Sequence, residues 1–254
     1  MPFPSSWRPQ APIDPVRLGR DADGGYVLPR AVVDAADALV TCGLGLEWTF
    51  EEHFRRLSAA PIRCYDHTIG RDTWIAGLVD DVRRRRPDTW RLRRSYRRLF
   101  LTSSSATHRR IRIGTEFTGP GHCTLTDLLD TGPDGALGSV LLKIDIEGGE
   151  YRLLPEILAL EDRIAALIIE FHDVDLHRER ITTFLGSLRR LGVCWVHANN
   201  SGGLDQDGDP VVLEMTLVGP ENRGGDARES RESARLSVPN DPRFPDPPVR
   251  FLET

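Results

Sequence analysis

The strongest constraint on the fold is the alternation, along most of the chain, of short apolar runs with segments of helical periodicity. Apolar runs of strand length separated by helices predict an α/β fold with a largely parallel sheet. The last two runs are joined by the turn-rich residues 199–210, which predicts a hairpin and therefore an antiparallel last strand. We expect seven strands, at residues 38–42, 62–65, 111–117, 140–146, 164–171, 193–198 and 211–218.

Local signals predict where the helices begin and end. Thr49 and Glu52 have the spacing of a capping box, which predicts a helix starting at Thr49. Further helices are expected at residues 124–129, 151–160 and 178–191, the last ending in a left-handed cap at Gly192.

The chain also divides into segments of different composition. Residues 1–37 are expected to be a leader that packs across the sheet, and residues 38–218 the main domain. Within that domain, residues 71–110 form an arginine-rich insertion, expected to hold two helices with a break near Pro87. Residues 219–254 are rich in Gly, Pro, Arg and Glu. We expect 221–232 to be mobile and the final stretch to lie extended on the surface.

Size and composition favour one domain with a single core. The chain has 254 residues, of which 39% are hydrophobic, enough for one sizeable core. No apolar run has the length of a membrane span, and the first residues lack the pattern of a signal peptide. The four cysteines show no CxxC spacing. We therefore expect a cytoplasmic protein with reduced, mostly buried cysteines and no membrane partner.

Charge is unevenly distributed along the chain. The net charge of −5 argues against a general nucleic-acid binder. Twelve arginines nevertheless lie between positions 83 and 112, interleaved with Trp90, Tyr96 and Phe100. This segment is either a solvated helical face, which is the simpler interpretation, or an electropositive cap for an anionic substrate or carrier.

Two turns at predicted strand ends suit a nucleoside cofactor. In an open α/β sheet, ligands bind outside the carboxyl ends of the strands. Gly43-Leu44-Gly45 follows the first strand and precedes the helix start at Thr49, so backbone amides are available to a ligand. Asp66 follows the second strand, where a carboxylate can accept hydrogen bonds from the two hydroxyls of a ribose.

Acidic and imidazole side chains lie at the ends of three further strands. Asp145 follows the fourth strand, Glu170 and His172 the fifth, and His197 the sixth. If the fourth and fifth strands are neighbours, Asp145 and Glu170 lie about 5 Å apart. Their repulsion would raise one pKa unless a cation lies between them. Lys143, the chain's only lysine, either neutralises these carboxylates or contacts the substrate.

The chemistry of this set is open at the level of sequence. With Asp145, the residues Glu170, His172 and His197 could bind a divalent metal. They could equally act as a general base without a metal, or make only structural hydrogen bonds.

These residues lie in motifs that resemble the FkbM family of S-adenosylmethionine-dependent methyltransferases. The most specific motif is residues 142–150, Leu-Lys-Ile-Asp-Ile-Glu-Gly-Gly-Glu. Further similarity lies in Gly43-Leu44-Gly45 with Phe50 and Glu51, in residues 169–172, and in residues 197–200 with Leu213 and Glu214. The resemblance spans residues 17–218. It implies a single Rossmann-like class I methyltransferase domain, with a seven-stranded, mostly parallel sheet and an antiparallel last strand.

The resemblance also implies a reaction, the transfer of a methyl group from S-adenosylmethionine to a hydroxyl of a sugar or secondary metabolite. Its implied site residues are Gly43, Gly45 and Glu47 for the methionine part, Asp66 for the ribose, Asp145 at the reacting centre, and Glu170, His172 or His197 as base or metal ligand. By analogy with catechol-type O-methyltransferases, a divalent metal such as Mg²⁺ could activate the substrate. The chain departs from the usual class I glycine motif, because Thr41 replaces the acidic residue and Glu47 the third glycine.

Two other classes of function compete with this interpretation. A nucleotide-dependent oxidoreductase could use the same sheet, although the glycine turn lacks the third glycine. A non-catalytic binding protein could use the basic segment for a partner. The expected partner is a small-molecule or glycan substrate, which could carry an anionic group, and a homodimer is left open.

Overall fold

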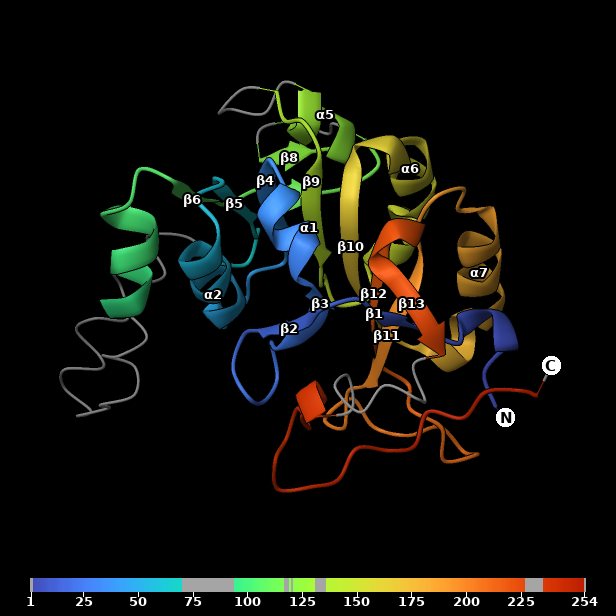
Figure 1. Cartoon of the computed structure of the whole chain (residues 1–254). Helices are drawn as coiled ribbons and strands as arrows, with labels where there is room; N and C mark the ends of the chain where they lie inside the picture. Colours follow the sequence, from blue (N-terminus) through green and yellow to red (C-terminus); the bar gives the residue numbers. More distant parts are fainter. Residues whose placement is uncertain are drawn as a thin grey trace.

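A computed structural model describes residues 2–69, 94–116, 119, 121–130, 136–226 and 235–253. Its centre is a seven-stranded sheet (Figure 1). From edge to edge the strands are β11 (Gly192–Ala198), β12 (Leu213–Val218), β10 (Ile164–Phe171), β9 (Val140–Ile144), β4 (Ala38–Cys42), β5 (Ile62–Tyr65) and β6 (Ala106–Arg109). All are parallel except β12, which is antiparallel to both β10 and β11. The predicted architecture is confirmed: a Rossmann-like α/β fold with a seven-stranded, mostly parallel sheet and an antiparallel last strand.

Helices cover both faces of this sheet (Figure 1). One face packs against α1 (Arg30–Ala35) and α2 (Thr49–Leu57), and the other against α5 (Leu125–Asp130), α6 (Leu154–Ala159) and α7 (Val174–Ser187). Short helical turns occupy Ser5–Trp7, Arg97–Leu101, Glu150–Arg152, Glu161–Arg163 and Pro220–Asn222. Because both faces are buried, the central strands are almost continuously apolar, which made them visible in the sequence.

Strand β9 shows how the two faces are divided. Val140, Leu142 and Ile144 pack in the cluster under α5, α6 and α7, whereas Leu141 packs in the cluster of α1 and α2. Side chains alternate along a strand, so Lys143 points to the same face as Leu141. The only lysine is therefore a buried side chain, with a relative exposure of 4%.

The third predicted strand, at residues 111–117, is wrong as a strand of the main sheet. The edge strand is instead β6, whose residues Ala106–Arg109 pair with β5. Within residues 111–116, the described part of the predicted run, only Arg112–Ile113 is a strand, β7, which pairs with β8 (His122–Cys123) in a separate small sheet. An edge strand pairs on one side only and needs less apolar surface, so the mostly polar sequence of β6 carried little signal.

One predicted cap and one predicted helix end are wrong. Helix α2 begins at Thr49 as predicted, but the capping box is absent: Trp48 is the N-cap, with no side-chain capping bond, and the Thr49 amide donates to Glu47 Oε1 at 2.8 Å. Helix α7 ends at Ser187 and Gly192 begins β11, so there is no left-handed cap at Gly192. The buried Glu161 accepts hydrogen bonds from the amides of residues 189–191, which stabilises the extended connection between α7 and β11.

Segments near the two ends of the chain pack against the sheet and against each other. The hairpin of β2 (Pro15–Leu18) and β3 (Tyr26–Pro29) accepts a hydrogen bond at Val27 O from Thr216 in β12. β13 (Arg223–Asp226), within a segment expected to be mobile, pairs with β1 (Gln10–Pro12). Residues 237–253 run as an extended strap across the molecule to a bridge between Phe251 and Phe3 (Figure 1).

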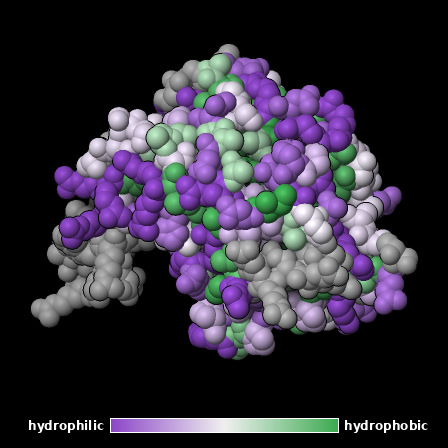
Figure 2. All heavy atoms as spheres, in the orientation of Figure 1, coloured by the Kyte–Doolittle hydropathy of each residue, from purple (hydrophilic) through white to green (hydrophobic). Residues whose placement is uncertain are grey.

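The arginine-rich insertion lies mostly in residues 70–93, outside the described residues, and with it the predicted break at Pro87. In its described part, Tyr96, Leu99 and Phe100 are buried, and Tyr96 OH lies 2.7 Å from His108 Nδ1. Arginines on the same segment are exposed, and hydrophilic side chains cover it at the left of Figure 2. These aromatic rings therefore belong to the core. No helix in the described part of the chain is long and apolar enough to cross a membrane.

Candidate active site

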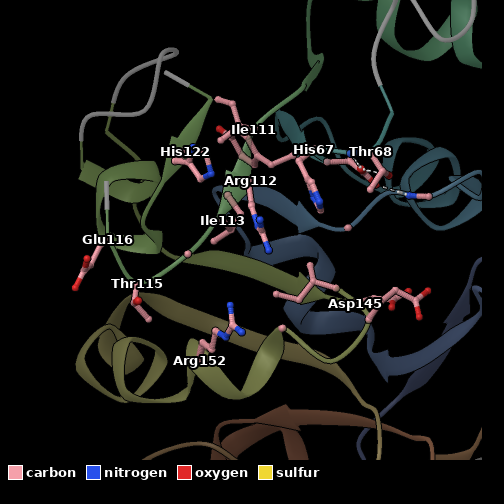
Figure 3. A pocket seen from close by; sticks show the side chains of 18 residues that line it. His67, Thr68, Ile111, Arg112, Ile113, Thr115, Glu116, His122, Asp145 and Arg152 are labelled. Atoms are coloured by element: carbon pink, nitrogen blue, oxygen red, sulfur yellow. Dashed lines mark hydrogen bonds between the residues drawn. The ribbon is translucent and has the colours of Figure 1, made fainter. Parts of the chain in front are cut away.

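A cavity of about 460 Å³ opens at the carboxyl ends of β4, β5 and β9 (Figure 3). Gly43 and Gly45 after β4, Asp66 after β5, and Asp145 after β9 line it. In Figure 3, Asp145 lies on one side and Glu116, Thr115 and His122 on the other. Four of the five predicted cofactor residues thus border one cavity, at the edge where an α/β sheet binds ligands.

The glycine turn is built around its contact with Asp145. Gly43 has a φ of +84°, and a Cβ placed on it would lie 1.6 Å from the backbone oxygen of Asp145. Backbone bonds join the turn to both neighbours: Gly43 N donates to Tyr65 O, and Asp145 N to Cys42 O, each at 2.9 Å. Only glycine fits this position, which holds β4, β5 and β9 together at the cavity.

Asp66 holds the glycine turn in place. Its Oδ2 accepts hydrogen bonds from the amides of Leu44 and Gly45, at 3.0 and 2.9 Å. Its Oδ1 accepts from the amide and hydroxyl of Thr68 and from the amide of Ile69. These bonds outweigh burial and lower the pKa of Asp66. With five donors on one carboxylate, Asp66 must release at least one of them to bind a ribose.

Glu47, the fifth predicted cofactor residue, lies beside the turn rather than in the cavity lining. Its Oε2 is 3.1 Å from Nε of Arg20, and its side chain packs against Gly24. Glu47 thereby joins the glycine turn to residues 19–25 of the terminal hairpin.

The strands that carry Asp145 and Glu170 are neighbours, which was the condition for bringing the two carboxylates together. β9 and β10 are adjacent and parallel, with Ile144 paired to Ile169. Asp145 and Glu170 are the next residues on the two strands, so they lie side by side. Burial and then Asp145 raise the pKa of Glu170. Asn199 Nδ2 donates to Glu170 Oε1 at 3.0 Å, and His172 Nε2 lies 3.9 Å from the same oxygen.

His172 is held by a buried carboxylate that the sequence interpretation did not assign to the site. The backbone amide of His172 donates to Glu150 Oε1 at 2.9 Å, and its Nδ1 lies 3.2 Å from the same oxygen. The other ring nitrogen, Nε2, is 3.4 Å from Glu147 Oε2. Burial lowers the pKa of His172, but Glu150, Glu170 and Asp145 outweigh it and raise that pKa above its usual value.

Lys143 lies beneath this group, between Tyr26 and another carboxylate absent from the predicted site. Its Nζ is 5.2 Å from the centre of the Tyr26 ring. Burial lowers the pKa of Lys143, but Glu51, Asp145 and Glu170 together raise it. Glu51 is fully buried and accepts a hydrogen bond from Thr41 at 2.7 Å. Glu51 had been quoted in a motif of the FkbM resemblance and Thr41 as a departure from the glycine motif, and a polar residue at a core position was a further signal that could have placed them here.

His197 is buried away from the cavity. β12 separates its strand from β10, so Glu214, not Glu170, is its direct neighbour in the sheet. Its Nδ1 lies 3.1 Å from Ser237 Oγ on the C-terminal strap, and burial lowers its pKa to about 4. The described residues therefore do not bring His197 together with Asp145 and His172.

Comparisons with known proteins give only remote similarity. No family model matches the chain, and no curated protein matches its sequence. A precorrin-6y C5,15-methyltransferase from Geobacter metallireducens is 13% identical, with 74% of this chain and 86% of that chain covered and a TM-score of 0.37. A Streptococcus pneumoniae protein in complex with S-adenosyl-L-methionine, provisionally described as a tRNA (m1A22) methyltransferase, is 11% identical, covering 80% and 73%, with a TM-score of 0.39.

The 23S rRNA methyltransferase ErmE is 8% identical, with 81% of this chain and 71% of that chain covered and a TM-score of 0.38. Similarities at this level carry no information about activity or ligand. Membership of the FkbM family stays a prediction, and the site has to be interpreted from its own geometry.

The glycine turn gives a first prediction. Gly43→Ala should lower the free energy of unfolding by more than the roughly 1–3 kcal/mol of a strained backbone, because its Cβ also meets Asp145 O. Gly45→Ala is the matched control: its φ is +56° and a Cβ meets nothing within 4 Å, so a loss of about 1 kcal/mol is expected. Urea denaturation measures both, and equal losses would contradict the assigned packing.

His197 gives a second prediction, on the pH dependence of stability. Its pKa is about 4 in the folded protein and about 6.5 when unfolded, so the unfolded chain binds the extra proton. The contribution of the neutral His197 ring to the free energy of unfolding is fully present above pH 6.5, and it is lost as the pH falls toward 4. Between pH 7.5 and 5, wild type should lose about 2 kcal/mol more unfolding free energy than His197→Gln. Parallel losses in urea denaturation at the two pH values would refute a buried neutral His197.

Proposed function

We propose that this chain is an S-adenosylmethionine-dependent methyltransferase that transfers the methyl group to a hydroxyl oxygen. The observation that carries the proposal is the cavity formed by the glycine turn and Asp145, next to the buried Glu170 and the partly buried His172. A turn with free space at Gly45 admits a cofactor close to the backbone, as cofactor binding at this edge requires. The acidic and imidazole groups then lie where the acceptor would react.

Asp145 is the residue we assign to the sulfonium. It lines the cavity, and its carboxylate lies on the same side of the sheet as Lys143 and Glu170. A negative charge near the sulfonium favours binding and orientation of the charged cofactor. We infer that Asp66 acts on the cofactor through the turn it holds, with a ribose contact only after a donor is released.

Transfer to oxygen requires a base as well as alignment. The S–CH₃ bond breaks as the O–CH₃ bond forms, and the sulfonium becomes a neutral thioether. The hydroxyl proton must pass to the protein, and we assign it to the carboxylate of Glu170, beside which His172 lies. A carboxylate whose pKa is raised by burial is a stronger base than an ordinary one.

Two arginines support an anionic acceptor. Arg112 in β7 and Arg152 after β9 both line the cavity, and their guanidinium groups point toward each other across it in Figure 3. Among the described residues neither side chain has a hydrogen bond or ion pair. A carboxylate or phosphate on the acceptor would fit between them.

Cofactor binding tests the proposal first. S-adenosylhomocysteine should bind in calorimetry carried out in excess EDTA. Asp145→Asn should weaken S-adenosylmethionine about fivefold more than S-adenosylhomocysteine, because only the former carries the sulfonium charge. The exposed Asp34→Asn is the control and should change neither affinity. Binding of a dinucleotide in place of both ligands would favour an oxidoreductase instead.

Acceptor preference tests the arginine pair. Transfer of tritiated methyl groups is measured on hydroxylated compounds presented both as carboxylates and as their neutral amides. Arg152→Met should raise KM several-fold for the carboxylates and leave KM for the amides unchanged, because one charged contact at an exposed site is lost. Arg55→Met, on the exposed face of α2, should change neither. An equal effect on both acceptor forms would refute the anionic subsite, and no transfer to any hydroxyl would favour a binding protein.

A further inference from the structure

We propose that Asp145, Glu147 and His172 form a binding site for one divalent first-row transition-metal ion. Each residue offers one ligand atom, and these atoms all lie within 4.8 Å of one another. An ion bound about 2.0–2.2 Å from each ligand atom would need only small side-chain movements to bridge them. Glu147 is 87% exposed and free to make such a movement. The set differs from the predicted one, since it includes Glu147 and leaves out both Glu170 and His197.

The orientation of His172 is independent support for a metal. A metal-bound histidine usually donates its second ring N–H to a carboxylate, which fixes the tautomer and the ring. Here Nδ1 of His172 faces the fully buried Glu150, at 3.2 Å, and the backbone amide of His172 bonds to the same oxygen. Nε2 is thereby directed at Glu147, 3.4 Å away. The second carboxylate oxygen of Glu150 is buried without a hydrogen bond, so the hydrogen bonds of this carboxylate go to His172.

The charge around the ring also fits a cation. Asp145, Glu147, Glu150 and Glu170 surround His172, and in the described part of the chain no hydrogen-bond donor other than His172 contacts the carboxylates of Asp145 or Glu147. Lys143 lies beneath the sheet edge, where its positive charge also interacts with the buried carboxylate of Glu51. A divalent ion would supply the positive charge on the open side of the group.

The ligand types limit the ion. Imidazole suits Fe²⁺, Ni²⁺, Cu²⁺ or Zn²⁺, and the two carboxylates also suit Mn²⁺, whereas Mg²⁺ and Ca²⁺ prefer oxygen ligands throughout. Three protein ligands leave positions free, and Asp145 and Glu147 line the cavity. The role of a metal in catalysis rests on the proposed methyl transfer, since a bound ion can lower the pKa of an acceptor hydroxyl. Metal binding itself does not depend on that function.

Mn²⁺ is the probe that tests the site, because free aqueous Mn²⁺ has a strong electron paramagnetic resonance spectrum that is lost on binding. Titration of the apoprotein, with no cofactor or acceptor, should show one bound Mn²⁺ per chain. Glu147→Gln, at an exposed position where folding is not at risk, should weaken Mn²⁺ about tenfold or more. The exposed Glu179→Gln on α7 is the matched control and should bind as wild type.

Glu150→Gln separates this site from general attraction by acidic residues. Glu150 would touch His172 and not the ion, so its loss should weaken Mn²⁺ by about 10- to 100-fold through the orientation of the ring. The circular dichroism spectrum checks that the variant is folded. Unchanged Mn²⁺ binding in both Glu147→Gln and folded Glu150→Gln would overturn the proposal, as would no binding by wild type.

Failure of the metal site and failure of the proposed function give different results. If Mn²⁺ does not bind but S-adenosylhomocysteine binds in EDTA, the metal site is wrong and the methyltransferase proposal stands. If Mn²⁺ binds with the expected variant pattern but neither S-adenosylmethionine nor S-adenosylhomocysteine binds, the metal site stands and the function is wrong.

Discussion

Two glutamates buried opposite each other require the rest of the structure to supply partners for their carboxyl groups. Glu170 in β10 and Glu214 in β12 are direct neighbours in the antiparallel pair, and both are almost fully buried. Like charges at such a pair are destabilising, and burying them without partners costs several kcal/mol. Burial and the neighbouring Glu170 accordingly raise the pKa of Glu214 well above its usual value. The two buried carboxyl groups therefore need hydrogen-bond donors from elsewhere in the chain.

Distant segments provide these groups. Asn240 on the C-terminal strap donates to Glu214 at 2.6 Å and to Asp23 of the N-terminal hairpin at 3.1 Å. Asn199, after β11, donates to Glu170. The terminal segments therefore supply hydrogen-bond partners to the buried polar side chains at the carboxyl edge of the sheet. A site assembled in this way depends on contacts between residues more than 200 positions apart.

The predictable part of this site was the part set by strand order. β4, β5, β9 and β10 are buried on both faces, so their apolar runs located Gly43, Asp66, Asp145 and Glu170 at the correct edge. His197 and β6 could not be placed in the same way. The partner of His197 is Ser237, brought in by a strap with no periodic signal, and β6 is a polar edge strand. Glu150 was quoted in a motif, but its function depends on the short turn that carries it under His172.

The identity of Lys143 follows from the same charge balance. The chain uses arginine at its 32 other basic positions, yet lysine at the one that is buried beneath Asp145 and Glu170. An ammonium is compact and can face Glu51, the strand-end carboxylates and the Tyr26 ring at once. A guanidinium is planar and directs its five donors in a fixed fork, which needs more space and more acceptors in its plane. Lys143 is almost fully buried on the face of the sheet that packs against α1 and α2, so the larger guanidinium would have to displace its neighbours there. The carboxylates above are therefore stabilised by a compact point charge.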